Sequence, residues 1–342
     1  MNQAEQHTIE GIYEVCIGVP EAIAAIQYWE QFGYRIGQVG ELSADIAQQL
    51  YSVNSALKSI RLYHQEADHG LIRLMVWQNP TNQGLGISSM KVKGNRWATT
   101  LTADGLSILN HAEQVKAAGW DIRFSNLYWD IIYNKDKISR PFIDPAVGVR
   151  EMLLLQPLTR QVLFQRFGYT LPNYGQINPN APFKTSQFTH MGLIVQDDSK
   201  EILKFYEDVL GLLRVRDDVE TRYEFSPAGR DFFDLNPGEK FIITAFDDPR
   251  SSASDFLTAR SGRLFITRFP DSIKLESRFE AAQPGCLGMS LYTYRVRGIQ
   301  TYCDRIRESS AENVTNIVTN EFGEMSFSFT APDGYFWTLV EN

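Results

Sequence analysis

The sequence repeats one arrangement of elements four times along its 342 residues. Each copy has an apolar stretch of strand length, then a segment with one apolar helical face, then further apolar stretches. The copies begin near residues 13, 96, 189 and 287. Four segments with the same order of elements indicate a chain of four equivalent modules, and this repeat constrains the fold more than any other feature.

The third copy shows the pattern most clearly, because it opens with FTHMGLIVQDDSKEILKFYEDVLGL at residues 188–212. Its apolar residues recur at i, i+3, i+4, i+7 and i+8, which predicts one buried helical face. These residues are Ile202, Phe205, Tyr206, Val209 and Leu210. The fourth copy has similar spacing at Ile299, Tyr302, Cys303 and Ile306. Each module is therefore predicted to be a strand, a helix and then several strands.

Composition excludes several classes of partner. The net charge is −8 and no cluster of Lys or Arg is present, which argues against affinity for nucleic acid or anionic membranes. Cys16, Cys286 and Cys303 are far apart and form no CxxC pair, so a reducing, cytoplasmic setting is expected. The polar N-terminal segment does not resemble a signal peptide, and no apolar run is long enough to cross a bilayer.

The opening of the third module and two closing segments resemble the vicinal oxygen chelate superfamily, which includes glyoxalase I, bleomycin-resistance proteins and extradiol dioxygenases. The closing segments are DPAVGVREML at 144–153 and APDGYFWTLV at 331–340. The resemblance covers nearly the whole chain. It implies an α+β fold of four βαβββ modules, paired into two half-open barrels that each form a cup around a small ligand.

The expected pairing is between consecutive modules, as the layout of extradiol dioxygenases implies. An N-terminal domain would combine two modules, and a C-terminal domain the other two. A segment with Pro, Asn and Gly would link the domains, and an insertion would bridge the last two modules. The predicted ranges are 8–157 (modules 8–80 and 92–157), linker 158–185, and 186–342 (modules 186–249 and 285–342, with insertion 250–284).

The C-terminal cup is expected to lack the metal triad of the superfamily. Extradiol dioxygenases hold iron with two His and one Glu, and the resemblance places His190 at one of these positions. Gly288 and Thr338 stand at the others, and one histidine cannot hold iron alone. We predict that His190 marks the pocket, as an acid or base. The predicted substrate-binding neighbours are Ser290, Tyr292, Phe336 and Thr338.

The N-terminal cup is expected to contain a polar cluster of Glu14, Arg73 and Glu151. Two carboxylates without histidine could hold Mg²⁺ or Mn²⁺, but a guanidinium pairs readily with carboxylates. A salt-bridged cluster is therefore favoured. The alternative metal ligands are His190, or Glu14 with Glu151.

The functional hypothesis is a glyoxalase/dioxygenase-like protein that binds a small, partly aromatic or apolar molecule in the C-terminal cup without a metal or other cofactor. It would act as a lyase, isomerase or cyclase, or sequester the molecule. The alternative is an extradiol-type dioxygenase or glyoxalase-type lyase dependent on Fe, Mn or another divalent metal. A small-molecule ligand or substrate is the expected partner, a homodimer is compatible with the sequence, and neither nucleic acid nor a membrane is expected.

Overall fold

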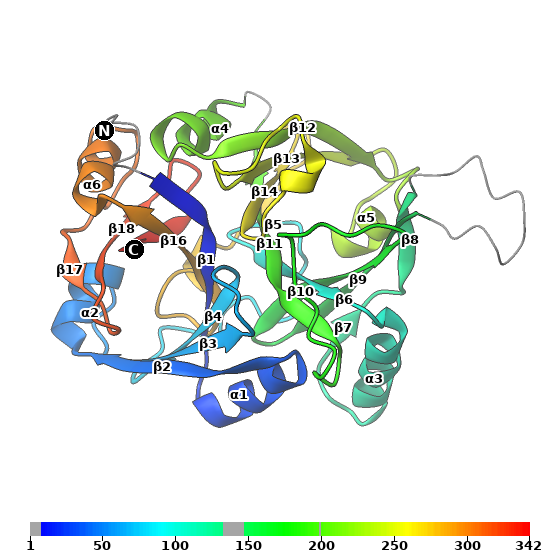
Figure 1. The fold of residues 1–342 in the computed structure, drawn as a ribbon, viewed down its shortest axis with the longest axis horizontal. Coiled ribbons are helices and arrows are strands. Elements are labelled where there is room, and N and C mark those ends of the chain that lie inside the picture. Colours follow the sequence, from blue (N-terminus) through cyan, green and yellow to red (C-terminus); the bar gives the residue numbers. More distant parts are fainter. Residues whose placement is uncertain (1–7, 133–146, 198–199) are drawn as a thin grey trace, which may run out of the picture.

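The computed structural model describes residues 8–132, 147–197 and 200–342, and its strands form two large curved sheets (Figure 1). One sheet, here the 1–4 sheet, contains strands of the first and fourth modules in the order β17-β18-β19-β16-β1-β4-β3-β2. The other, the 2–3 sheet, follows the order β12-β13-β14-β11-β6-β10-β9-β7, with β8 paired to β9. The four predicted modules and the two half-open barrels are therefore confirmed.

The strands of the 1–4 sheet are β1 (Thr8–Gly18), β2 (Tyr34–Leu42), β3 (Leu57–His64), β4 (Leu71–Trp77), β16 (Gly288–Arg297), β17 (Val318–Thr319), β18 (Met325–Thr330) and β19 (Phe336–Glu341). Those of the 2–3 sheet are β6 (Arg96–Thr102), β7 (Arg123–Phe124), β8 (Tyr128–Ile132), β9 (Gly148–Gln156), β10 (Thr159–Phe167), β11 (Thr185–Gln196), β12 (Leu213–Arg222), β13 (Lys240–Asp247) and β14 (Arg263–Phe269). The short strands β5 (Val92–Lys93) and β15 (Glu276–Ser277) pair in parallel apart from both sheets.

The helices are α1 (Ala22–Gln31), α2 (Ala44–Tyr51), α3 (Gly105–Ala117), α4 (Glu201–Lys204), α5 (Pro227–Phe232) and α6 (Ile299–Arg307). The predicted buried face of α6 is confirmed, because all four of its apolar residues are buried. The third-module helix differs from a regular α-helix, since α4 continues as a π-helical segment at Phe205–Val209. None of the described helices has the length and apolar character that crossing a bilayer requires.

The pairing of modules differs from the prediction. β1 pairs antiparallel with β16, and β6 pairs antiparallel with β11, so the first module joins the fourth and the second joins the third. The predicted domains 8–157 and 186–342 are therefore wrong as structural units. The physical reason is that every module presents an equivalent first strand for pairing, so proximity in sequence does not select the partner.

The last strands of the second and third modules lie outside the predicted module boundaries. β10 falls in the predicted linker 158–185, yet it forms a ladder with β9 and lies parallel to β6. β14 falls in the predicted insertion 250–284, yet it lies parallel to β11 within the 2–3 sheet. The polar residues of β10 obscured an alternation in which Val162, Phe164 and Arg166 share one face.

The helices α2 and α5 were not predicted, and each packs against the concave side of one sheet. Ser43 caps the start of α2 by accepting from the Ile46 amide, and Ser226 caps α5 by accepting from the Gly229 amide at 2.8 Å. Leu50 and Tyr51 of α2 join an apolar cluster with β1, β4 and β19. Phe232 of α5 joins a separate cluster with β10, β13 and β14.

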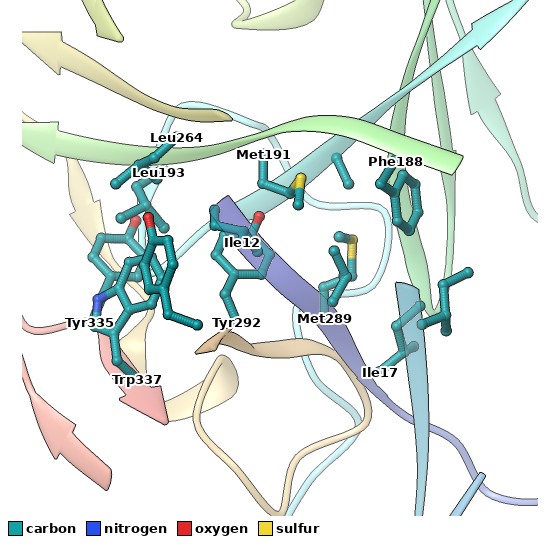
Figure 2. Packing of buried hydrophobic residues seen from close by; sticks show 14 of the residues in the cluster. Ile12, Ile17, Phe188, Met191, Leu193, Leu264, Met289, Tyr292, Tyr335 and Trp337 are labelled. Atoms are coloured by element: carbon teal, nitrogen blue, oxygen red, sulfur yellow. The ribbon is translucent and has the colours of Figure 1, made fainter. Parts of the chain in front are cut away.

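The main core lies between the two sheets, where side chains of β1, β16 and β19 meet those of β11 and β14 (Figure 2). Two tyrosine hydroxyl groups of the fourth module form hydrogen bonds across this core to the backbone of the 2–3 sheet. Tyr292 donates to the carbonyl of Trp97 at 2.8 Å, and the Tyr335 hydroxyl lies 2.8 Å from the carbonyl of Ile194 and 3.0 Å from its amide. Both tyrosines are fully buried, so these bonds hold one sheet against the other without competition from water.

Replacing Tyr335 with Phe is expected to lower the free energy of unfolding by about 1–3 kcal/mol, because buried backbone groups of Ile194 would lose their partner. Chemical denaturation followed by circular dichroism measures the change. The control is Tyr63→Phe, whose hydroxyl bond to Gln38 is exposed and whose loss should cost less than about 0.5 kcal/mol. Equal effects of the two changes would contradict the role given to Tyr335.

Candidate functional site

A cavity of about 300 Å³ lies in the cup of the 2–3 sheet. Strands β6, β9, β10, β11, β12, β13 and β14 contribute its walls, together with α5 and the segment 168–184 that joins the second and third modules. Aromatic rings form much of the lining, and among them are Trp97, Phe164, Phe232, Phe241 and Phe265. A cavity at this small end of the usual range for ligand sites fits a molecule of about one ring.

His190 lies on β11 in the wall of this cavity, and its side chain is buried. The ring centre is 4.5 Å from that of Phe265 and 4.9 Å from that of Phe164. Its Nδ1 atom lies 2.9 Å from the Tyr174 hydroxyl oxygen and 3.2 Å from the Thr189 hydroxyl oxygen. Its Nε2 atom has no hydrogen-bond partner within the described residues.

The hydrogen bonds around His190 determine which ring nitrogen carries the proton. Thr189 donates its hydroxyl proton to the carbonyl of Thr99. Nδ1 of His190 is the one acceptor that the described residues offer to the Tyr174 hydroxyl, and burial raises the pKa of Tyr174, so this hydroxyl keeps its proton and donates it. Nδ1 is then the acceptor, and a neutral imidazole must carry its hydrogen on Nε2.

The electrostatic surroundings keep His190 neutral. Burial lowers the pKa of His190 well below its ordinary value of 6.5, and the positive charges of nearby arginines lower it further. These arginines are Arg263, Arg166 and Arg216, and all three line the same cavity. His190 is therefore a neutral hydrogen-bond donor at Nε2, and its acid or base role stays a prediction.

The three arginines approach the cavity from different strands. Arg263 on β14 forms a two-pronged ion pair with Asp247, one contact being 2.8 Å between Nη2 and Oδ2. Arg166 on β10 donates to the carbonyl of Tyr174 at 3.1 Å. The guanidinium carbons of Arg166 and Arg263 lie 4.8 and 4.9 Å from the Tyr174 ring centre, so this ring contacts two cations.

Glu151 lines the cavity of His190, on β9. It was expected beside Glu14, but Glu14 lies on β1 of the other sheet, so the predicted cluster of Glu14, Arg73 and Glu151 is wrong for Glu151. The pairing Glu14 with Glu151 is for the same reason wrong as an alternative metal site. The Asp-Pro at 144–145 that helped to place Glu151 lies outside the described residues.

The cup of the 1–4 sheet contains a buried network of ion pairs instead of an open site. Arg73 and Arg61 both donate to the carboxylate of Glu14, which has no exposed surface. Arg73 also donates to Glu321 at 3.2 Å, and Arg61 to Glu324 at 2.8 Å. The predicted salt bridge between Glu14 and Arg73 is confirmed.

Sequence patterns did not predict that Arg61, Glu321 and Glu324 belong to this network. Arg61 could have been found, because it faces Arg73 across the antiparallel pair of β3 and β4. Glu321 and Glu324 belong to the β17–β18 connection, where no alternation of polar and apolar residues indicates which way a side chain points. Tyr51 of α2 completes the network by accepting from Arg73 at 2.8 Å and donating to Glu321 at 3.1 Å.

The four predicted substrate-binding residues do not share a cavity with His190. Ser290 and Tyr292 lie on β16, and Phe336 and Thr338 on β19, all in the 1–4 sheet. The Thr338 hydroxyl lies 2.7 Å from that of Ser328, and Phe336 packs in the cluster beneath α2. Their placement beside His190 depended on pairing the third and fourth modules, and that pairing is wrong.

Comparisons with known proteins agree with this architecture. The model of the Glyoxalase/Bleomycin resistance protein/Dioxygenase superfamily matches residues 187–339. Residues 187–339 belong to this superfamily. Glyoxalase I from Zea mays is 13% identical, with a TM-score of 0.55, over 100% of this chain and 95% of that chain. A putative dioxygenase from Bacillus subtilis subsp. subtilis str. 168 is 11% identical, with a TM-score of 0.56, over 98% of this chain and 86% of that chain. A comparison with curated protein sequences found no match.

The residues in neither cup fit the metal triad that the superfamily resemblance implies. Within the described ranges, no three His, Cys, Asp or Glu side chains are gathered in a geometry that could hold a metal ion. In the cavity of His190, two strands that could supply further metal ligands present other residues. The first strand of the second module presents Trp97, and the last strand of the third module presents Arg263. Gly288 lies on β16 in the other sheet and has no side chain to offer.

The buried carboxylate of Glu14 makes the stability of the protein depend on pH. Burial raises the pKa of Glu14, but the charges and hydrogen bonds of Arg61 and Arg73 outweigh burial and lower the pKa to about 2, from an ordinary value of 4.5. A pKa that is lower in the folded state contributes stability above the unfolded value, and this contribution is lost as pH falls toward the folded value. We expect unfolding free energy to decline between about pH 4.5 and pH 2.

Glu14→Gln should lower the free energy of unfolding at pH 7 by about 3–5 kcal/mol, because two buried guanidinium groups would lose their shared carboxylate. Urea denaturation at several pH values measures this, and the deficit should shrink as pH falls toward 2. The matched control is Glu41→Gln, whose exposed pair with Lys58 at 3.8 Å should contribute little. A deficit that does not change with pH would contradict this assignment.

Nitrogen NMR of protein labelled with ¹⁵N-histidine should show His190 neutral, with its proton on Nε2, from pH 8 down to pH 5. His190→Gln identifies the resonances by their loss. Tyr174→Phe removes the donor to Nδ1, so the tautomer with the proton on Nδ1 should become populated. Titration of His190 near pH 6.5, or an Nδ1 proton in the unaltered protein, would show that the hydrogen-bond assignment is wrong.

Proposed function

We propose that the protein binds a small, partly aromatic molecule in the cavity beside His190, and that it does so without a metal. The observation that carries this proposal is the Nε2 atom of His190, a buried polar group that lines a largely aromatic cavity and has no partner within the described residues. Buried polar groups in proteins are almost always hydrogen-bonded, so an unpaired one in a cavity wall indicates a missing ligand atom.

The chemistry available is proton transfer and hydrogen-bond donation. A neutral imidazole that donates from Nε2 polarises a carbonyl oxygen and stabilises the enolate that forms when a neighbouring carbon loses a proton. Glu151 supplies a carboxylate in the same cavity, of the type that accepts such a proton. These roles support a metal-independent lyase or isomerase, and they also serve a protein that only sequesters its ligand.

The alternative is a metal-dependent dioxygenase or glyoxalase-type lyase. It is favoured by one observation, that His190 and Glu151 line the same cavity and are both residue types that bind metals. The proposal without a metal is preferred because the described residues offer no third metal ligand beside His190 and Glu151. The last strand of the third module presents Arg263 to the cavity instead, and its positive charge would repel a cation.

Metal analysis of protein purified without chelators is expected to show far less than one equivalent of Fe, Mn, Zn or Ni, with no change in melting temperature on addition of a chelator.

In the same preparation, ligand-observed NMR should detect binding of trans-cinnamamide, a neutral one-ring probe. Ile243→Trp, which fills the cavity wall, should abolish that binding. One equivalent of a metal would favour the alternative, and equal binding by the Trp variant would place the ligand elsewhere.

A further inference from the structure

The polar groups around the cavity are unbalanced in charge and in hydrogen-bonding character. Among the described residues, Arg166, Arg216 and Arg263 supply three positive charges, while the carboxylates in or beside the cavity are Glu151 and Asp247. His190 adds a neutral donor at Nε2. These described residues therefore carry one positive charge in excess and more donors than acceptors, which favours a ligand that is an anion with several acceptor atoms.

The arginines differ in how fully their charges are matched. Arg263 is matched by the two-pronged ion pair with Asp247. Neither Arg166 nor Arg216 forms an ion pair with a carboxylate of the described residues. Arg166 donates to a backbone carbonyl and stacks on aromatic rings, and Arg216 lies half-buried on β12 at the cavity wall. These two guanidinium groups are therefore the ones with charge available for a ligand.

Tyr174 fixes the relative positions of these donors. Its ring packs against Arg166 and Arg263, and its hydroxyl donates to Nδ1 of His190, which leaves Nε2 as the donor on the other edge of the imidazole. One residue of the inter-module segment thus orders both the cationic groups and the neutral donor. A site ordered in this way before the ligand arrives loses less conformational entropy on binding.

We propose that the ligand of this cavity is a small aromatic carboxylate, whose carboxylate binds Arg166 and Arg216 while an oxygen atom of the ligand accepts from Nε2 of His190. This rests on the proposed function, because it describes the ligand of the same cavity. The aromatic rings of Phe164 and Phe265 pack against the apolar part of the ligand, and the cavity volume limits that part to about one ring.

The test compares trans-cinnamate with trans-cinnamamide, two probes of nearly equal shape that differ in charge, by titration calorimetry at low salt. Cinnamate is expected to bind about tenfold tighter or more, because its hydrogen bonds to guanidinium are charge-assisted. Arg166→Gln and Arg216→Gln should each reduce cinnamate affinity about tenfold and cinnamamide affinity by a clearly smaller factor. Arg222→Gln is the matched control, since Arg222 also lies on β12 but pairs with Glu220 outside the cavity.

The outcomes separate this inference from the proposed function. If both probes bind with equal affinity and Ile243→Trp abolishes both, the cavity binds aromatic molecules but the carboxylate assignment is wrong. If neither probe binds, the proposed function itself is contradicted. If Arg222→Gln lowers cinnamate affinity as much as Arg216→Gln does, the affinity depends on the general charge of the surface, and the specific carboxylate site is contradicted. The proposal is supported if Arg166→Gln and Arg216→Gln weaken cinnamate binding more than cinnamamide binding, while Arg222→Gln changes neither.

Discussion

The antiparallel pairing of first strands, β1 with β16 and β6 with β11, decides which side chains share a cup. It places His190 opposite residues of the second module and separates it from those of the fourth. Because the inward face of a strand is set by its two-residue period, a change of pairing partner replaces one whole wall of the site. The hydroxyls of Tyr292 and Tyr335 then fix the two sheets to one another through backbone contacts.

The two cups show different ways of filling the same architecture. In the 1–4 sheet, α2 and the network around Glu14 occupy the concave side, and every charge of Arg61 and Arg73 is matched by a carboxylate. Such matching of opposite charges is what a buried charge needs at low dielectric constant. In the 2–3 sheet, α5 fills only part of the cup. The cavity that is left has polar groups whose pairing within the described residues is incomplete, and this contrast is why we assign function to it.

Local pattern was enough to predict the modules and the face of α6, because each depends on residues a few positions apart. The contact between Glu14 and Arg73 was predicted from the superfamily resemblance, which places both residues in one cup. The partners of His190 could not be predicted in this way. Tyr174 lies in a segment without a helical or strand period, and Arg166 lies in a strand whose polar residues concealed its alternation. Their proximity to His190 follows from long-range packing, which no single stretch of sequence encodes.

The nested arrangement of the sheets also bears on how the chain folds. The 2–3 sheet is built from one continuous stretch, from β6 to β14, whereas the 1–4 sheet joins Gly18 to Gly288 across the whole of that stretch. Closing so large a loop is entropically unfavourable until its interior is compact. We therefore expect the sheet that holds the cavity to form first and to bring β1 and β16 within reach of each other, so that the functional half of the molecule serves as the template for the half that encloses it.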